Sequence, residues 1–114
     1  GGKLGEAHIL GRKTVELMTA DHLPERIENR IADSMDPSSA GYGFGLGVAV
    51  RRQAGIAALA GSKGDWYWSG VYGTYFWVDP AEQLSVVWMC ASPGLMRLRY
   101  RPMVRALVYQ AVDD

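Results

Sequence analysis

Hydrophobic and small residues alternate along residues 41–50. Gly or Ala stands at every second position, and Tyr, Phe, Leu and Val fill the positions between them. A period of two is typical of a β-strand, and the bare face lets another element approach closely. The same glycines do not form a phosphate-binding G-x-G-x-x-G loop, because Leu or Val stands in place of the third Gly in every register. We therefore expect a strand over 41–50.

Two further segments have the pattern of a hairpin. Residues 66–79 contain three of the four Trp and three of the six Tyr, and residues 84–90 form a nearly continuous apolar run. The polar residues 79–83 between them are typical of a turn, so we predict two antiparallel strands. A short additional strand is expected over 54–60.

Within this hairpin, we expect several residues to alternate into a hydrophobic core. They are Tyr75 and Trp77 on the first strand and Val87 and Met89 on the second. The single cysteine, Cys90, follows an apolar run and is expected to be a buried thiol, not a nucleophile. One cysteine excludes an internal disulfide.

Helical spacing is found near both ends of the chain. A short helix is expected within residues 10–23, closed by Pro24, and an exposed loop over 24–40. A second, amphipathic helix is expected to begin with Pro102 in its first turn. The predicted fold is α+β: an antiparallel sheet of three to four strands, a short N-terminal helix, and a C-terminal helix packed on the sheet, with the glycine face as the candidate surface.

Composition places these elements in one domain, residues 1–114. The chain is 48% hydrophobic, which is enough for a sizeable core, and its 12 basic residues balance 12 acidic ones. The balance gives no attraction to nucleic acid or to an anionic membrane, and no apolar run reaches the ~18 residues of a membrane span. The chain opens with Gly-Gly-Lys and not with Met, so we expect it to be processed or cut from something longer. Its compartment is left open.

Few residues have the spacing of a catalytic or metal site. His8 and His22 have no second ligand at metal-ligand spacing and are interpreted as surface residues, so no metal and no cofactor is expected. No serine has a Lys three residues on, as a Ser-x-x-Lys nucleophile requires.

Four arginines cluster before and within the last predicted helix. They are Arg97, Arg99, Arg101 and Arg105. Such a cluster can grip an anionic group, but in a neutral chain without a nucleic-acid motif we interpret it as a solvated face.

Five segments in order resemble a known superfamily. They are GGKLGEAHILGRKTVELM, GYGFGLGVAV, WSGVYGTYFWVDP, LSVVWM and the final helix ending LVYQAV. Together they are similar to the C-terminal part of the serine beta-lactamase and penicillin-binding-protein superfamily, in its class C and carboxylesterase branch. The resemblance covers nearly the whole chain but only about a third of such an enzyme.

The resemblance implies a substrate-facing strand edge at residues 68–72. Trp68-Ser69-Gly70 matches the Trp-x-Gly of beta-lactamase-like carboxylesterases, where beta-lactamases carry Lys-Thr-Gly. Gly70 would leave room for substrate, the N–H of Val71 would help form an oxyanion hole, and Tyr72 would belong to the same edge. Trp in place of Lys favours a small acyl ester over a beta-lactam as the substrate of the parent enzyme.

The nucleophile of the superfamily is absent from these 114 residues. Neither its Ser-x-x-Lys nor its Tyr-x-Asn motif occurs, so we expect a C-terminal fragment of a serine hydrolase that is inactive without the missing N-terminal part. An unprotected sheet would favour a homo-oligomer. The alternative is a stand-alone module in which Tyr67, Trp68 and Tyr72 stack on a small ligand, and a third hypothesis is hydrolysis with Ser69 as nucleophile.

Overall fold

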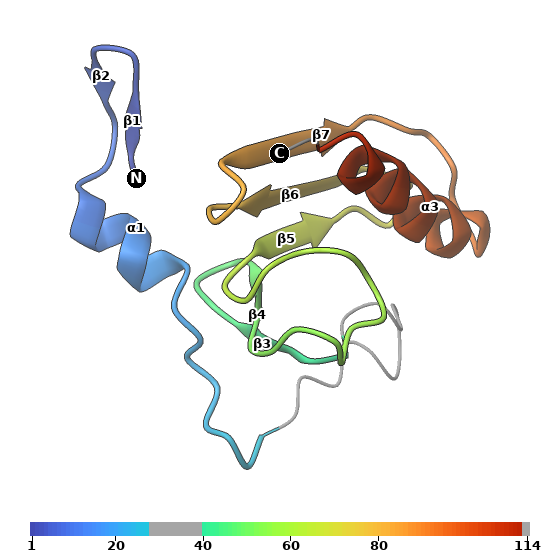
Figure 1. The fold of residues 1–114 in the computed structure, drawn as a ribbon, viewed down its shortest axis with the longest axis horizontal. Helices are drawn as coiled ribbons and strands as arrows, with labels where there is room; N and C mark the ends of the chain where they lie inside the picture. Colours follow the sequence, from blue (N-terminus) through green and yellow to red (C-terminus); the bar gives the residue numbers. More distant parts are fainter. Residues whose placement is uncertain (28–39, 113–114) are drawn as a thin grey trace.

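The fold is built around one antiparallel sheet. The computed structural model describes residues 1–27 and 40–112. Five strands of the sheet lie side by side in the order in which they follow along the chain (Figure 1). They are β3 (Tyr42–Phe44), β4 (Ala49–Arg51), β5 (Trp66–Ser69), β6 (Tyr75–Asp79) and β7 (Leu84–Trp88). The expected α+β class is confirmed. The sheet has five strands and not the expected three to four, because residues 41–50 and 66–79 each form two strands instead of one.

Two helices and a small hairpin complete the fold. The strands β1 (Lys3–Leu4) and β2 (Ala7–His8) pair with each other and lead into α1 (Arg12–Met18). The long helix α3 (Met96–Gln110) lies across the sheet at the end of the chain, away from α1 (Figure 1). The two helices therefore belong to different sides of the molecule.

The strand expected over residues 41–50 is wrong, because the chain reverses in its middle. Gly47 has φ +91°, which favours glycine, and the Gly45 N–H donates to the Val48 carbonyl at 2.8 Å. A hairpin keeps the period of two in both arms, so alternation alone does not reveal the turn. The segment 54–60, expected to be a strand, forms turns and bends instead.

The bare face of β3 is approached closely, as predicted, but not by the C-terminal helix. A Cβ built on Gly43 would lie 2.1 Å from the Asp21 carboxylate, and one on Gly45 would lie 2.3 Å from the Met18 carbonyl oxygen. The segment that leaves α1 therefore occupies this face. The glycine face as the packing surface of α3 is a wrong prediction.

The helix α3 packs on the opposite, aromatic face. Tyr42, Tyr67, Tyr75 and Trp77 are at most 3% exposed and form the core cluster. The ring of Trp77 stacks on Tyr109 of α3 at a centroid distance of 6.3 Å. The predicted burial of Tyr75 and Trp77 is thus confirmed.

Val87 and Met89, which were expected in the core, are 71% and 77% exposed. The register pairs Phe76 with Val87, and Trp77 with Val86. Residues opposite each other share a face, so Val87 lies on the face that α3 does not cover. Cys90 is half-buried and not buried as expected.

Both helices have limits other than those expected. The helix α1 ends before Thr19, well short of Pro24, and α3 begins six residues before Pro102. Pro102 removes one helical hydrogen bond, yet Arg101 and Arg105 are both buried and anchor α3 on either side of it. The loop expected over 24–40 lies mostly outside the described residues.

Candidate functional site: the end of strand β5

The predicted site residues lie together at the end of β5 and in the turn that follows it. Trp68 and Ser69 are the last two residues of β5, and Gly70, Val71 and Tyr72 lead toward β6. Trp68, Val71 and Tyr72 are 37%, 58% and 71% exposed, and Ser69 and Gly70 between them are half-buried. The segment 68–72 is therefore a rim of the sheet that is open to an incoming molecule.

Backbone hydrogen bonds fix the shape of this rim. Gly70 donates its N–H to the Thr74 carbonyl at 2.9 Å, and Gly73 donates to the Gly70 carbonyl at 3.0 Å. The Tyr72 carbonyl accepts from the Ser92 N–H at 2.7 Å, which ties the turn to the segment after β7. Among the described residues, none accepts a hydrogen bond from the Val71 amide. That N–H is available to a ligand.

Glycine is required at the two ends of the turn. A Cβ on Gly70 would lie 2.2 Å from the Thr74 hydroxyl. Gly73 has φ +112°, and its Cβ would lie 2.9 Å from the backbone nitrogen of Ser92. Larger residues would push the rim out of shape.

An apolar hollow of about 420 Å³ adjoins the rim. Trp68 and Phe76 line it from neighbouring strands, together with Val87, and Ser69 and Thr74 add hydroxyls. The ring of Trp68 is steadied by an edge contact with Phe44 at 5.4 Å. Of the described residues that line this hollow, none has a charged side chain, so the lining suits an uncharged apolar group.

Ser69 has no activating base in the part of the chain that is described. Residues 1–27 and 40–112 contain no His, Lys or carboxylate that hydrogen-bonds its hydroxyl. A serine nucleophile needs such a partner. The rim therefore combines an unpaired backbone N–H at Val71 with a serine that lacks an activating base among the described residues.

A buried ionic cluster lies beneath the sheet on the α3 side. Asp65 accepts hydrogen bonds from Arg51 at 2.8 Å and from Arg105, and both ion pairs are inaccessible to solvent. The hydroxyl of Tyr42 donates to the other Asp65 oxygen at 2.8 Å. Burial raises the pKa of Asp65, while Arg105, Tyr42 and Arg51 oppose that rise.

The remaining donors of this cluster also find partners. Arg51 and Arg105 both donate to the Ala60 carbonyl, and Arg105 donates to the Tyr75 hydroxyl at 3.0 Å. The pKa of Arg105 is raised above its ordinary value: burial lowers it, but the surrounding Tyr and Asp groups outweigh burial. The cluster fastens α3 to the sheet and lies away from the rim.

A second carboxylate, Asp79, closes the same face at the far end of β6. It accepts hydrogen bonds from the Ser62 N–H at 2.9 Å and the Tyr109 hydroxyl at 2.8 Å. Burial raises the pKa of Asp79, but these hydrogen bonds outweigh burial and hold the pKa below its ordinary value. Asp79 therefore stays ionised and structural.

The solvated face predicted for the arginine cluster is wrong for two of its four members. Arg101 and Arg105 are 3% and 0% exposed, and only their i, i+4 spacing, which places both on one side of α3, could have suggested their burial. The partners of Arg105 lie 30 and 40 positions away in sequence, which local patterns do not reveal.

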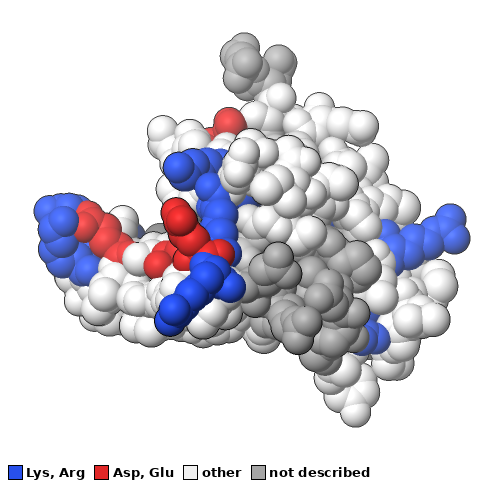
Figure 2. Space-filling model, turned by 90° about the horizontal axis from the view of Figure 1, so that it is seen from below, with Lys and Arg blue, Asp and Glu red and all other residues white. Residues whose placement is uncertain are grey.

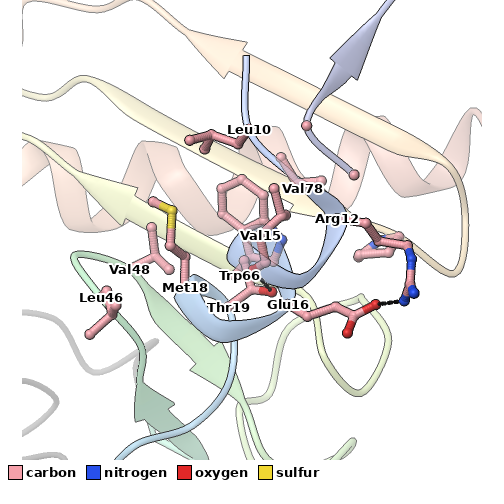
Figure 3. A pocket seen from close by; sticks show the side chains of 13 residues that line it. Leu10, Arg12, Val15, Glu16, Met18, Thr19, Leu46, Val48, Trp66 and Val78 are labelled. Atoms are coloured by element: carbon pink, nitrogen blue, oxygen red, sulfur yellow. Dashed lines mark hydrogen bonds and ion pairs between the residues drawn. The ribbon is translucent and has the colours of Figure 1, made fainter. Parts of the chain in front are cut away.

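A second hollow, of about 730 Å³, lies between α1 and the other face of the sheet. Val15 and Met18 face Trp66 and Val78 across it (Figure 3). Near its edge, Arg12 pairs with Glu16 (Figure 3). Thr19, another polar residue of the lining, donates its hydroxyl to the Val15 carbonyl, so this hollow offers fewer unpaired polar groups than the rim.

The surface charges are mixed. On the face drawn in Figure 2, basic side chains lie beside acidic ones at one end of the molecule. Of the described residues, no group of three His, Cys, Asp or Glu is placed to hold a metal ion. Within the same residues, no helix is long and apolar enough to cross a membrane.

Comparison with known proteins identifies the family to which this fold belongs. The sequence model of the Beta-lactamase family matches residues 3–110, so the chain belongs to that family. A comparison with curated proteins gave no match.

Solved structures share the fold. EstCE1, "a hydrolase with promiscuous acyltransferase activity", is 32% identical with a TM-score of 0.74, and the alignment covers 92% of this chain and 26% of EstCE1. Unliganded simvastatin synthase (LovD) from Aspergillus terreus is 21% identical with a TM-score of 0.67, over 93% of this chain and 30% of LovD. A mutant of LovD matches at 21% identity and a TM-score of 0.66, over 90% and 29%. The chain therefore spans less than a third of the length of these structures.

Proposed function

We propose that the chain is the C-terminal part of a beta-lactamase-like serine hydrolase that acts on short acyl esters. In this proposal, residues 1–114 are a single subdomain and segment 68–72 is its substrate-facing edge. The nucleophile comes from a part of the enzyme outside these residues. The chain alone binds an acyl group but does not cleave it.

The observation that supports this role most directly is the Val71 amide. It lies on an exposed rim and has no acceptor among residues 1–27 and 40–112, whereas the neighbouring Gly70 and Gly73 amides are both paired. An N–H of this kind is suited to the oxyanion that forms on an ester carbonyl. In hydrolases such a donor is worth about 3 kcal/mol of transition-state stabilisation.

The hollow beside the rim supports an ester over a beta-lactam. Its lining is mainly aromatic and aliphatic, with Trp68 where beta-lactamases have a lysine, and none of its described residues is a cation that could pair with a penicillin carboxylate. Family membership and the likeness to EstCE1, a hydrolase, agree with this choice.

A binding experiment tests the proposal. In ¹⁵N-labelled chain, methyl butyrate is expected to shift the amide signals of Ser69 and Val71 and to leave the remote Gly64 unchanged. Trp68→Ala removes the apolar wall and is expected to weaken that response. A response to benzylpenicillin equal to or stronger than that to methyl butyrate would contradict the ester assignment.

A second candidate function is self-association through the uncovered sheet face. Val87 is 71% exposed and Met89 is 77% exposed, and both lie next to Phe76 and Trp68. Apolar side chains grouped in this way favour a homo-oligomer. Sedimentation of wild type and Val87→Glu tests it: the charge is expected to lower the mass of the assembly, and a wild-type monomer at all concentrations would rule it out.

A further inference from the structure

The buried arginine of α3 that reaches the rim is Arg101. It is 3% exposed, and its Nη2 donates to the Gly70 carbonyl and, at 3.3 Å, to the Thr74 carbonyl. Its guanidinium also lies 5.9 Å from the centre of the Tyr75 ring. Arg101 therefore connects the last helix directly to the turn of the candidate site.

The carbonyl that Arg101 contacts belongs to the same peptide unit as the Val71 amide. In a trans peptide, the C=O and the N–H lie in one plane and point in opposite directions, and the described part of the chain has no cis bond. The Gly70 carbonyl also accepts from the Gly73 N–H at 3.0 Å. Two donors on one side thus fix the plane and direct the Val71 N–H away from α3.

We propose that Arg101 is a positioning residue that orients and strengthens the Val71 N–H as an oxyanion donor. A charge-assisted hydrogen bond to the carbonyl draws electron density from the peptide unit, and hydrogen bonds in such a chain strengthen one another. The inference rests on the proposed function, and it adds a residue that lies 31 positions after Gly70 in the sequence.

Arg105, one turn further along α3, is a structural arginine with which Arg101 can be compared. Its guanidinium pairs with the Asp65 carboxylate and the Tyr75 hydroxyl, inside the sheet and away from the rim. Arg101 instead donates to two backbone carbonyls at the two ends of the exposed turn. The difference in partners gives the two residues different tasks.

The test uses ¹³C,¹⁵N-labelled full chain, in which the Gly70 carbonyl carbon and the Val71 amide proton are observed separately. Arg101→Met is expected to move both signals upfield, and Arg101→Lys, which keeps the charge but not the fork of donors, to move them less. Arg99→Met is the matched control, because Arg99 is an exposed arginine of the same helix. In Arg99→Met, the Gly70 carbonyl and Val71 amide signals are expected to match those of wild type.

Sodium butyrate then serves as the probe of anion binding at the Val71 amide. We expect the wild-type Val71 signal to shift on titration, and Arg101→Met to bind butyrate about tenfold more weakly. A loss of this kind in a folded variant, partly restored in Arg101→Lys, is not expected of a merely structural residue.

The outcomes separate the inference from the function on which it rests. A Gly70 carbonyl signal that is the same in Arg101→Met and Arg99→Met overturns the inference. If Arg101→Met does not fold, an unchanged Gly70 signal in Arg101→Lys overturns it equally. A third outcome is that the Gly70 carbonyl signal changes in the Arg101 variants but butyrate does not shift the Val71 signal of wild type. The proposed oxyanion role then fails, while the orientation of this peptide unit by Arg101 is supported.

Discussion

The two faces of the five-stranded sheet differ in how they are closed. The face under α3 contains aromatic rings and an ionic cluster whose members are almost inaccessible, including Arg51, Asp65 and Arg105. The other face and the rim expose apolar side chains, among them Val87 and Tyr72. The comparison indicates that stability is concentrated on the face under α3. The part of the other face around Val87, which α1 does not cover, and the rim are available for a ligand or a partner.

The largest expected effect comes from removing the charge at the centre of the covered face. Asp65→Asn leaves Arg51 and Arg105 buried without their shared counter-ion, which costs about 3 to 5 kcal/mol of unfolding free energy. Urea denaturation followed by Trp fluorescence measures it. Glu16→Gln, which breaks an exposed ion pair, is the control and is expected to leave the midpoint unchanged. Equal stability of the two variants would contradict the comparison.

A second, smaller effect on stability is expected from filling the space beside the ionic cluster of Asp65. Gly61 has φ +138°, and a Cβ there would lie 2.2 Å from the Asp65 carboxylate and 2.5 Å from Arg105. Gly61→Ala is expected to destabilise by about 3 kcal/mol through strain and overpacking.

Gly64 is the matched control in the same turn. It has φ +86° with open space around it, so Gly64→Ala is expected to cost only about 1 kcal/mol through backbone strain. Thermal unfolding of both variants separates strain from crowding. A Gly64→Ala variant as unstable as Gly61→Ala would show that the cluster is not tightly packed.

The hydrogen bond from Tyr109 to Asp79 predicts a pH dependence on the covered face. The folded-state pKa of Asp79 lies below its ordinary 3.8, so its contribution is present above that value and is lost as pH falls through the folded-state pKa. Tyr109→Phe is expected to cost about 1 kcal/mol at neutral pH.

That difference between wild type and Tyr109→Phe should shrink as pH falls below about 4. Asp65 contributes with the opposite sign, since burial raises its pKa, but it is present in both proteins and cancels in the difference. Urea midpoints at a series of acidic pH values measure it. A stability difference between wild type and Tyr109→Phe that grows as pH falls would contradict the prediction.

The smallest effect on stability is expected at the rim. Tyr72 is 71% exposed, so Tyr72→Ala should change unfolding free energy by less than about 0.5 kcal/mol. The same variant should weaken binding of methyl butyrate at the rim. A clear loss of stability would indicate that Tyr72 serves the fold instead of a ligand.

Local sequence patterns predicted the parts of the fold that depend on near neighbours. The hairpin of β6 and β7 and the burial of Tyr75 and Trp77 follow from alternation, which is a property of adjacent positions. The turn at Gly47 was missed because alternation continues through a hairpin. The face of Val87 was assigned wrongly because the register between strands is set across the sheet.

The site was predicted through resemblance and not through spacing. The residues 68–72 do form a continuous rim, but their roles remain proposals. The buried role of Arg101 and Arg105 was not foreseen, since their partners on Gly70 and Asp65 are distant in sequence. Only the three-dimensional contacts reveal that two of the four clustered arginines are part of the interior.

The central claim, that the rim is separated from its nucleophile, is tested most directly by ester turnover. Purified chain is incubated with p-nitrophenyl butyrate and compared with Ser69→Ala. We predict that both proteins release nitrophenolate at the rate of buffer alone, because Ser69 has no base beside it among the described residues. Turnover by the wild-type chain that disappears in Ser69→Ala would contradict the account.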